Sequence, residues 1–307
     1  MRPELVVEKS HAEKARRGAS QADVAWRRFR RNKSGIAGLS IVSFFLAMAA
    51  YGLFLDPVPP RSFACLYQGC TNVPPFTTWA HPLGTELAGI DIWQEIIHGS
   101  AGDLYVGVVA TAIAVALGVV IGAVAGYRGG ISGVLLLGVT QIFFTLPVLV
   151  IILLVARVSI LLVAHGLGLT LIVLILAAFG WPGIAFITRG EIFRVRELEY
   201  IQASKALGAS TYRILFRHII PNILSSVIVV SSLLVAGNIL TEVVISFLGF
   251  SDPSASTWGL TLEEGLTTVR SSWWVSFFPG LAVVFCVLAF NLLGDGLSDA
   301  LNPRLRE

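Results

Sequence analysis

The sequence predicts an all-α, polytopic membrane protein with six transmembrane helices. Composition, run length and charge placement are the observations that predict it. Hydrophobic residues make up 55% of the 307 residues and charged residues only 13%, against roughly 25% charged residues in an ordinary soluble domain. The mean hydropathy is +0.79. Runs of about 18 or more apolar residues can cross a hydrocarbon core of roughly 30 Å as helices, because a helix satisfies its own backbone hydrogen bonds.

Six such runs follow one another along the chain. They cover residues 35–55, 104–126, 131–156, 168–187, 223–250 and 275–297. The third and fifth runs are longer than a straight crossing needs, so we expect tilt or a kink. Pro147 in the third run and Pro182 in the fourth each remove a backbone donor and are the expected kink sites.

The runs also divide the chain into segments. These are a basic N-terminal segment (1–34), the first helix (35–55), an outer segment (56–103), a five-helix core (104–297) with one long loop (189–221), and a tail (298–307). Of the 22 Lys and Arg residues, all but Arg61, Arg157 and Arg270 lie before the first run, at Arg128, in the long loop or after the last run. Basic residues are retained on the cytoplasmic side. We therefore expect a multi-pass protein of the cell membrane with both termini in the cytoplasm.

The basic stretch AWRRFRRNKSG precedes the first run. It has two interpretations. It can lie against anionic headgroups with Trp26 and Phe29 at the interface, or it can be a solvated tail that only sets the topology.

Two outer segments have a character of their own. Residues 81–100 place Ile90, Ile92, Trp93, Ile96 and Ile97 at a mixed helical spacing, which predicts a short amphipathic helix along the outer face or, alternatively, a packed surface loop. The segment 251–274 is too polar to enter lipid and ends in Trp273 and Trp274, which suit the interface as aromatic anchors. A soluble protein outside the membrane could dock on both segments.

The three cysteines fall in two places. Cys65 and Cys70 share the outer segment, where a disulfide and two free thiols are both compatible with their spacing. Cys286 lies in the last run and is expected to be a small apolar filler. No cysteine and histidine spacing of a zinc site occurs, so no metal site is expected.

Small and polar residues inside the runs have different expected roles. Gly118, Gly122 and Gly126 form a G-x3-G-x3-G ridge that permits close helix packing. Polar residues in lipid are costly unless they face a cavity or a partner. The candidates for lining a path, or alternatively for bonding helices together, are Gln141, Thr145, Asn238, Glu242 and Asn291. For Glu242 the helix-locking role is the leading interpretation.

The chain carries no motif for ATP chemistry of its own. A P-loop requires glycine directly before its lysine, whereas Lys9, Lys14, Lys33 and Lys205 follow Glu, Glu, Asn and Ser. No metalloprotease or serine-hydrolase motif occurs either. We therefore do not expect the chain to be an enzyme by itself.

The loop 189–221 contains an amphipathic, glycine-broken stretch. A helix is expected from about 191 to 206, followed by Gly208 as a terminator with positive φ. Ser210 or Thr211 can cap a second short helix, and Pro221 marks the entry to the fifth run. A short helix at such a corner can fill a groove on a cytoplasmic protein or rest on the bilayer with its arginines at the headgroups.

The corner resembles the EAA loop of binding-protein-dependent ABC importer permeases. The consensus Glu-Ala-Ala-x3-Gly-x12-Pro is matched by Gln202-Ala203-Ser204, Gly208 and Pro221, with Gln and Ser as mild departures. The stretches FRRNKSGIAGL, HPLGTELAGID, TEVVISFLGFSDPSASTWG and FPGLAVVFCVLAFNLLGDGLSDALNPRL are similar to the C-type permeases of the dipeptide, oligopeptide and nickel branch. One departure is Gly89-Ile90-Asp91, where that branch commonly has Gly-Arg-Asp.

The resemblance implies a type I importer permease fold that forms half of a pore. It implies a heterodimer with a B-type permease, two ATPase subunits that bind ATP and Mg, and an extracytoplasmic binding protein that selects the cargo. Peptides are the default cargo, with nickel chelates and oligosaccharides as alternatives. A stand-alone secondary transporter is the rival class, but the paired repeats typical of one are not evident. The residues expected to contact the ATPase are Tyr200, Gln202, Ala203, Ser204, Lys205, Ala206, Leu207, Gly208, Ala209, Ser210, Arg213, Arg217 and Pro221.

Overall fold

The computed structural model describes residues 21–56, 70–151, 153–154, 168–250 and 255–301. Within them the regular elements are helical, apart from one isolated β-bridge between Thr85 and Asp91. The elements are α2 (Gln21–Phe29), α3 (Lys33–Phe54), α4 (Ile92–Arg128), α5 (Gly130–Thr145), α7 (Gly168–Arg196), α8 (Glu199–Ala206), α9 (Thr211–Ile214), the π-helix η2 (Leu215–Ile219), α10 (Ile220–Phe247), α11 (Trp258–Thr268) and α12 (Trp274–Leu301).

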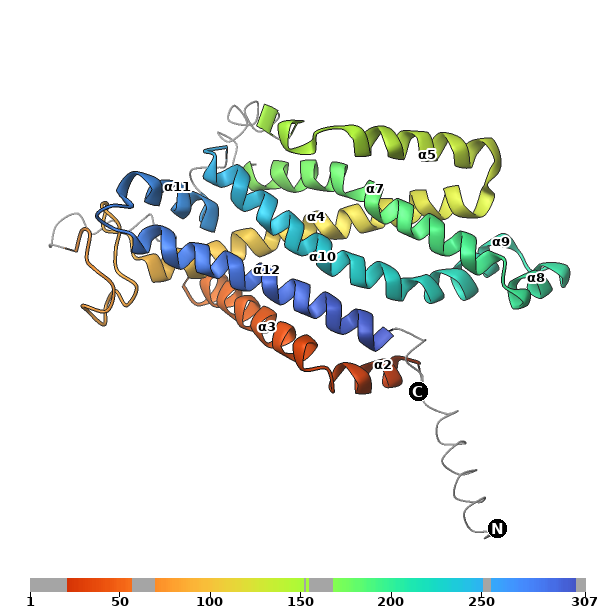
Figure 1. The fold of residues 1–307 in the computed structure, drawn as a ribbon, viewed down its shortest axis with the longest axis horizontal. Helices are drawn as coiled ribbons and strands as arrows, with labels where there is room; N and C mark the ends of the chain where they lie inside the picture. Colours follow the sequence, from red (N-terminus) through yellow and green to blue (C-terminus); the bar gives the residue numbers. More distant parts are fainter. Residues whose placement is uncertain (1–20, 57–69, 152, 155–167, 251–254, 302–307) are drawn as a thin grey trace, which may run out of the picture.

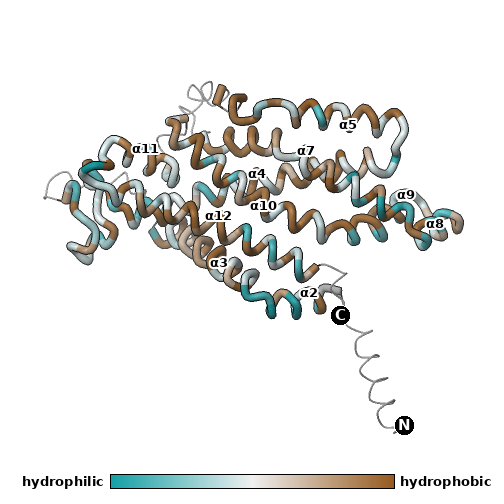
Figure 2. The backbone as a smooth tube through the Cα atoms, viewed as in Figure 1, coloured by the Kyte–Doolittle hydropathy of each residue, from teal (hydrophilic) through white to brown (hydrophobic). Residues whose placement is uncertain are grey.

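The long helices lie side by side in an elongated bundle (Figure 1). The helices α8 and α9 lie at one end, with α2 toward that end, whereas α11 and the segment before α4 lie at the other. Hydrophobic residues run along the long helices, and hydrophilic residues gather at α2 and near α9 on one side and in the segment before α4 on the other (Figure 2). This distribution is the one a bilayer around the middle of the bundle requires.

Among the described residues, five helices are long and apolar enough to cross a membrane. They are α3, α4, α7, the stretch Thr211–Phe247 that contains α10, and α12. Five of the six predicted spans are thus matched by a helix of sufficient length and composition. The sixth candidate is α5, an apolar helix of 16 residues, which is about 24 Å long at 1.5 Å per residue.

The third predicted span, 131–156, is wrong as one continuous helix. The helix α5 ends at Thr145, and Leu146 is extended with φ −70° and ψ 133°. A residue before proline is pushed out of the helical region by the proline ring, and Pro147 follows. A new helical turn begins beyond it, with Val150 and Ile151 donating to the Pro147 carbonyl oxygen. The proline therefore breaks this helix where a kink was expected, while Pro182 stays inside the continuous helix α7.

The short outer helix expected within 81–100 is also wrong as a separate element. A single helix of 37 residues, α4, begins at Ile92 and continues through the predicted second span. Asp91 caps it, because its side chain accepts a hydrogen bond from the Trp93 backbone at 2.8 Å. Ile92, Ile96 and Ile97 are buried against the rest of the bundle. At about 56 Å in length, α4 extends well beyond the hydrocarbon core.

The glycine ridge of α4 packs directly on the backbone of α7, as predicted. A Cβ built on Gly118 would lie 2.7 Å from the Trp181 carbonyl oxygen, and one on Gly122 would lie 2.6 Å from the Ala185 carbonyl oxygen. At Gly126 the corresponding distance to the Arg189 carbonyl oxygen is 3.0 Å. Contacts this short are at or below the limit that real Cβ atoms show. The two helices can therefore touch only because these positions lack side chains.

The half of the bundle that contains α11 is centred on Trp258, the largest fully buried side chain among the described residues. Its ring meets Phe45 of α3 edge to face at 5.4 Å between centroids. Cys286 of α12 lies in the same apolar cluster and is fully buried, which agrees with its expected role as a filler. This cluster joins α3, α4, α10, α11 and α12.

Two aromatic residues assigned to the membrane interface are buried instead. Phe29 is only 3% exposed, because its ring packs at the point where Gly35 and Gly296 bring α3 and α12 together. Trp274 is 5% exposed, and its indole Nε1 donates to the Thr85 carbonyl oxygen at 3.1 Å. Each therefore anchors a neighbouring segment to the bundle. Trp26 and Trp273 remain about half exposed.

Candidate functional site

The first candidate site is the corner segment, residues 199–221. The helix α7 ends at Arg196, and Leu198 is extended before α8 begins at Glu199. The expected single helix from 191 to 206 is therefore two helices with a break at 197–198. Gly208 has φ +79°, as predicted, in the turn that follows α8.

The second half of the corner also follows local chemistry. The side chain of Ser210 accepts a hydrogen bond from the Arg213 backbone at 3.3 Å and so caps α9. A π-helical turn, Leu215–Ile219, joins α9 to α10. Pro221 lies in the first turn of α10, directly after the π-helical turn.

The face of the corner segment that packs on the long helices contributes to a buried apolar cluster. Six side chains with at most 1% exposed surface form it, and they come from α7, α8, α9, η2 and α10. They are Ile192, Val195, Ile201, Ile214, Ile219 and Ile223. Tyr127 and Ala123 at the end of α4 pack against the same cluster. The corner segment is thus held as one body with the ends of three long helices.

The face of the corner segment that is turned away from this cluster carries exposed side chains. Leu207 is 88% exposed and Tyr212 is 70% exposed. The ring of Tyr212 packs on that of Phe216 at 4.4 Å. The residues expected to contact an ATPase are exposed, except for Ser204 and Ala209, which are half-buried. Tyr212 was not among them, although an exposed aromatic residue beside the cap is a signal of a contact surface.

The second candidate site lies between α5 and α7. Gln141, Phe144 and Thr145 of α5 face Gly183, Phe186 and Ile187 of α7 across an open cavity of about 630 Å³. The predicted pair Gln141 and Thr145 is thus brought to one cavity wall. The rings of Phe144 and Phe186 meet edge to face at 5.3 Å, so two aromatic rings and two polar side chains share the lining of the cavity.

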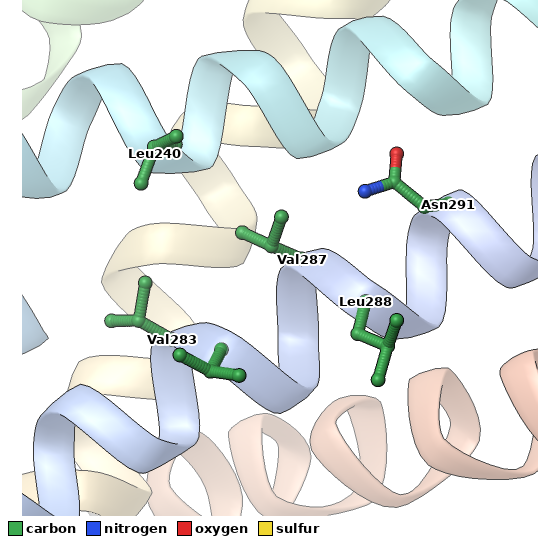
Figure 3. A pocket seen from close by; sticks show the side chains of 6 residues that line it. Leu240, Val283, Val287, Leu288 and Asn291 are labelled. Carbon is green, nitrogen blue, oxygen red and sulfur yellow. The ribbon is translucent and has the colours of Figure 1, made fainter.

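Asn291 borders a smaller cavity of about 290 Å³ between α10 and α12. Its amide points toward α10, and the remaining lining is aliphatic (Figure 3). These aliphatic residues are Leu240, Val283, Val284, Val287 and Leu288.

The other two polar candidates lie inside the bundle and line neither of these cavities. Asn238 is 5% exposed and donates from Nδ2 to the Thr111 hydroxyl of α4 at 3.0 Å. Glu242 is fully buried and accepts a hydrogen bond from the Ser246 hydroxyl. The Asn238 bond joins α10 to α4, whereas Ser246, which donates to Glu242, lies in α10 itself.

Two acidic residues that were not predicted as site residues hold α11 in place. Asp103 accepts a hydrogen bond from the Trp258 backbone at 3.0 Å, and Glu95 accepts one from the Thr261 hydroxyl at 2.8 Å. The Trp258 indole donates to the Ile96 carbonyl oxygen at 3.0 Å. Because both acids precede the second apolar run, the sequence assigned them to the outer segment, although they are buried.

The remaining predicted site concerns cysteines. Cys65 lies outside the described residues, so its disulfide with Cys70 stays a prediction. Ile90, at the position where the resemblance led us to expect an arginine, is 8% exposed. It therefore lies in the packed segment before α4 and offers no charge at that end of the bundle.

Comparison with known proteins agrees with this geometry. The family model described as "Binding-protein-dependent transport system inner membrane component" matches residues 118–307, and the model of the N-terminal TM domain of oligopeptide transport permease C matches residues 20–75. The dipeptide transport system permease protein of Bacillus subtilis (strain 168) is 38% identical over 92% of this chain and 85% of its own length.

Two further relatives have similar coverage. The oligopeptide transport system permease protein of Bacillus subtilis (strain 168) is 33% identical over 91% of this chain and 88% of its own. The glutathione transport system permease protein of Pectobacterium atrosepticum is 33% identical over 92% and 90%. The chain therefore belongs to the family of binding-protein-dependent transport system inner membrane components, as a permease subunit of an ABC importer.

Proposed function

We propose that this chain is the C-type permease subunit of an ATP-driven peptide importer and that it forms one half of the translocation pore. The cargo assignment rests on the names of the three relatives above, which are named for dipeptide, oligopeptide and glutathione transport. All three names are those of peptides. Peptide cargo is therefore preferred to the sugars and nickel chelates that the sequence left open.

The corner segment is the contact for an ATPase subunit. It presents exposed apolar side chains, Leu207 and Phe216, beside the exposed cations Lys205, Arg213 and Arg217. Apolar anchors within a charged rim fit a groove on a partner protein. The buried cluster on the other side of the segment gives the partner a rigid body to push. ATP and Mg would bind in two such ATPase subunits and not in this chain.

The cavity between α5 and α7 is the part of the pathway that this chain supplies. It is open on one side, and its polar groups, Gln141 and Thr145, carry no formal charge. A homologous B-type permease would close the open side. Neutral hydrogen-bonding groups suit cargo that varies in charge, because an upstream binding protein makes the selection.

The ends of the bundle set the topology that we propose. The described start of α2, the end of α12 and the corner segment lie toward the same end (Figure 1), which would be cytoplasmic. There Arg27, Arg30 and Arg31 of the exposed N-terminal stretch would meet anionic lipid headgroups. The opposite end, with α11 and residues 70–91, would receive the extracytoplasmic binding protein.

Peptide uptake into proteoliposomes tests this proposal. The vesicles would contain this chain with its companion permease and ATPase subunits. The binding protein and a labelled peptide would be added on the side of the membrane that exposes α11 and residues 70–91. We expect uptake that requires ATP and is competed by unlabelled di- and oligopeptides. Uptake of only an oligosaccharide or a nickel chelate would contradict the peptide assignment, whereas uptake by this chain alone without ATP would contradict the importer assignment.

A further inference from the structure

The corner segment is joined to the end of α4 by side chains as well as by the apolar cluster. Lys205 of α8 lies over the ring of Tyr127, with its ammonium 5.7 Å from the ring centroid. Arg196, the last residue of α7, donates from Nη1 to the Gly126 carbonyl oxygen at 3.0 Å. Tyr127 and Gly126 both belong to the last turn of α4.

The position of Arg196 is closely defined. Its guanidinium lies 4.3 Å from the ring centroid of Phe193, and its Nε donates to Glu197 at 3.0 Å. The side chain is 22% exposed. Gly126 supplies one of the last four carbonyls of α4, which lack the usual partner inside the helix. A cation at this end also interacts favourably with the helix dipole, so Arg196 is a cap that one helix supplies to another.

A second hydrogen bond continues this connection into α8. Gln202 donates from Nε2 to the Arg196 carbonyl oxygen at 3.0 Å. An amide has N–H groups to donate, whereas an ionised carboxylate only accepts. The glutamine at the first position of the EAA-like pattern therefore makes a bond in this chain that an ionised glutamate could not make. Gln202 and Arg196 form a relay from α8 through the end of α7 to α4.

The end of α4 leads directly into the wall of the cavity. Gly129 and Gly130 join α4 to α5, and both have positive φ, +63° and +58°. A connection this short lets a displacement of α4 reach α5, which carries Gln141 and Thr145. The close backbone contact along the glycine ridge makes α4 and α7 move together.

We propose that Arg196 and Gln202 are positioning residues that transmit a displacement of the corner segment to α4 and, across the two-glycine turn, to the α5 wall of the cavity. This inference rests on the proposed function, because it specifies how the ATPase contact acts on the pathway. The corner segment then moves three long helices, α4 together with α7 and α10.

The test measures peptide uptake and ATP hydrolysis in the same proteoliposomes of the complete importer. Arg196→Met and Gln202→Met remove the donors at nearly constant side-chain length. We expect each to lower the peptide taken up per ATP about tenfold, the change that loss of one hydrogen bond to a charged or helix-end group brings to a conformational equilibrium. The rate of ATP hydrolysis of Arg196→Met should stay close to wild type, because Arg196 lies in α7, outside the corner segment that contacts the ATPase. Gln202 lies within that segment, so Gln202→Met is judged by its uptake per ATP alone.

The controls separate transmission from simple stability. Arg194→Met removes an exposed arginine of the same helix turn. Within the described residues, the hydrogen bonds of Arg194 go to Glu191 of α7. This variant should leave uptake per ATP unchanged. Arg196→Lys keeps a donor for Gly126 and should restore part of the loss. A merely structural role would lower uptake and hydrolysis in proportion, with an unchanged ratio.

Two results would overturn the inference. Wild-type uptake per ATP in both methionine variants would show that the relay transmits nothing, and a proportional fall of both activities would show that it only holds the fold. Either result leaves the proposed function standing, since the wild-type importer transports. If the wild-type complex hydrolyses ATP and takes up no peptide, the proposed function fails and the relay fails with it.

Discussion

At Gly122, the absence of a Cβ atom allows the close contact between α4 and α7. A Cβ there would be 2.6 Å from the Ala185 carbonyl oxygen and 2.8 Å from the Thr188 Cβ. The nearer neighbour is backbone and cannot rotate away. Gly138 of α5 is a helical glycine as well, but a Cβ on it would meet no atom of the described residues within 4 Å.

We therefore expect Gly122→Val to destabilise the folded permease by about 1–3 kcal/mol through overpacking. Gly138→Val is the matched control and should be nearly neutral, since the same side chain enters open space. Thermal unfolding in detergent measures both. Equal unfolding temperatures for the two variants would mean that α4 and α7 do not touch as described.

The sequence could predict features whose cause is local to the chain. Gly208 at positive φ and Ser210 as a cap both follow from the chemistry of a few neighbouring residues. Glu95 and Asp103 could not be predicted as buried acids, because their burial depends on α11, which arrives more than 150 residues later. Trp274 was misassigned for the same reason, since its partner, Thr85, is remote.

At the scale of elements, length and hydropathy were enough to locate the long helices, but not to place their ends. The helix α4 was predicted too short because Glu95 and Asp103 interrupt the apolar run within residues 92–103. Both acids find partners on α11. The helix α11 itself has no apolar run and was not predicted. Its N-terminus is fixed by Thr257, whose side chain accepts from the Leu260 backbone at 3.4 Å, and by Asp103.

The attachment of α11 to α4 can be tested by removing one hydroxyl group. Thr261→Val keeps the side-chain shape and removes the donor to the buried Glu95, which should cost about 1–3 kcal/mol. Thr267→Val is the control in the same helix, because Thr267 is exposed and its hydroxyl donates to the Glu264 carbonyl oxygen of its own helix. Hydrogen exchange should speed up for the amides of α11 in the first variant. Unchanged exchange would contradict the proposed attachment.

At the scale of the whole molecule, the proposed function requires the two ends of the bundle to lie on opposite sides of the membrane. Trp79 is fully exposed in the segment before α4, and Leu207 is 88% exposed at the corner. In a background with the native cysteines replaced, a membrane-impermeant thiol reagent added outside intact cells should label Trp79→Cys and not Leu207→Cys. Labelling should reverse in inside-out vesicles. Labelling of both from one side would contradict the topology.

The most direct measurement of the central claim compares Gly208→Leu with Gly208→Asn in the reconstituted importer. Gly208 has φ +79°, and a Cβ at this position would meet no atom of the described residues within 4 Å. Leucine therefore brings backbone strain of about 1 kcal/mol or more without a clash, whereas asparagine tolerates this conformation better than most residues. At an equal amount of assembled importer in the vesicles, we predict that peptide uptake and cargo-stimulated ATP hydrolysis fall together in Gly208→Leu, because the strain lies in the ATPase contact itself, and stay near wild type in Gly208→Asn. Normal transport in both variants would contradict the claim that the corner segment links ATP hydrolysis to the pathway.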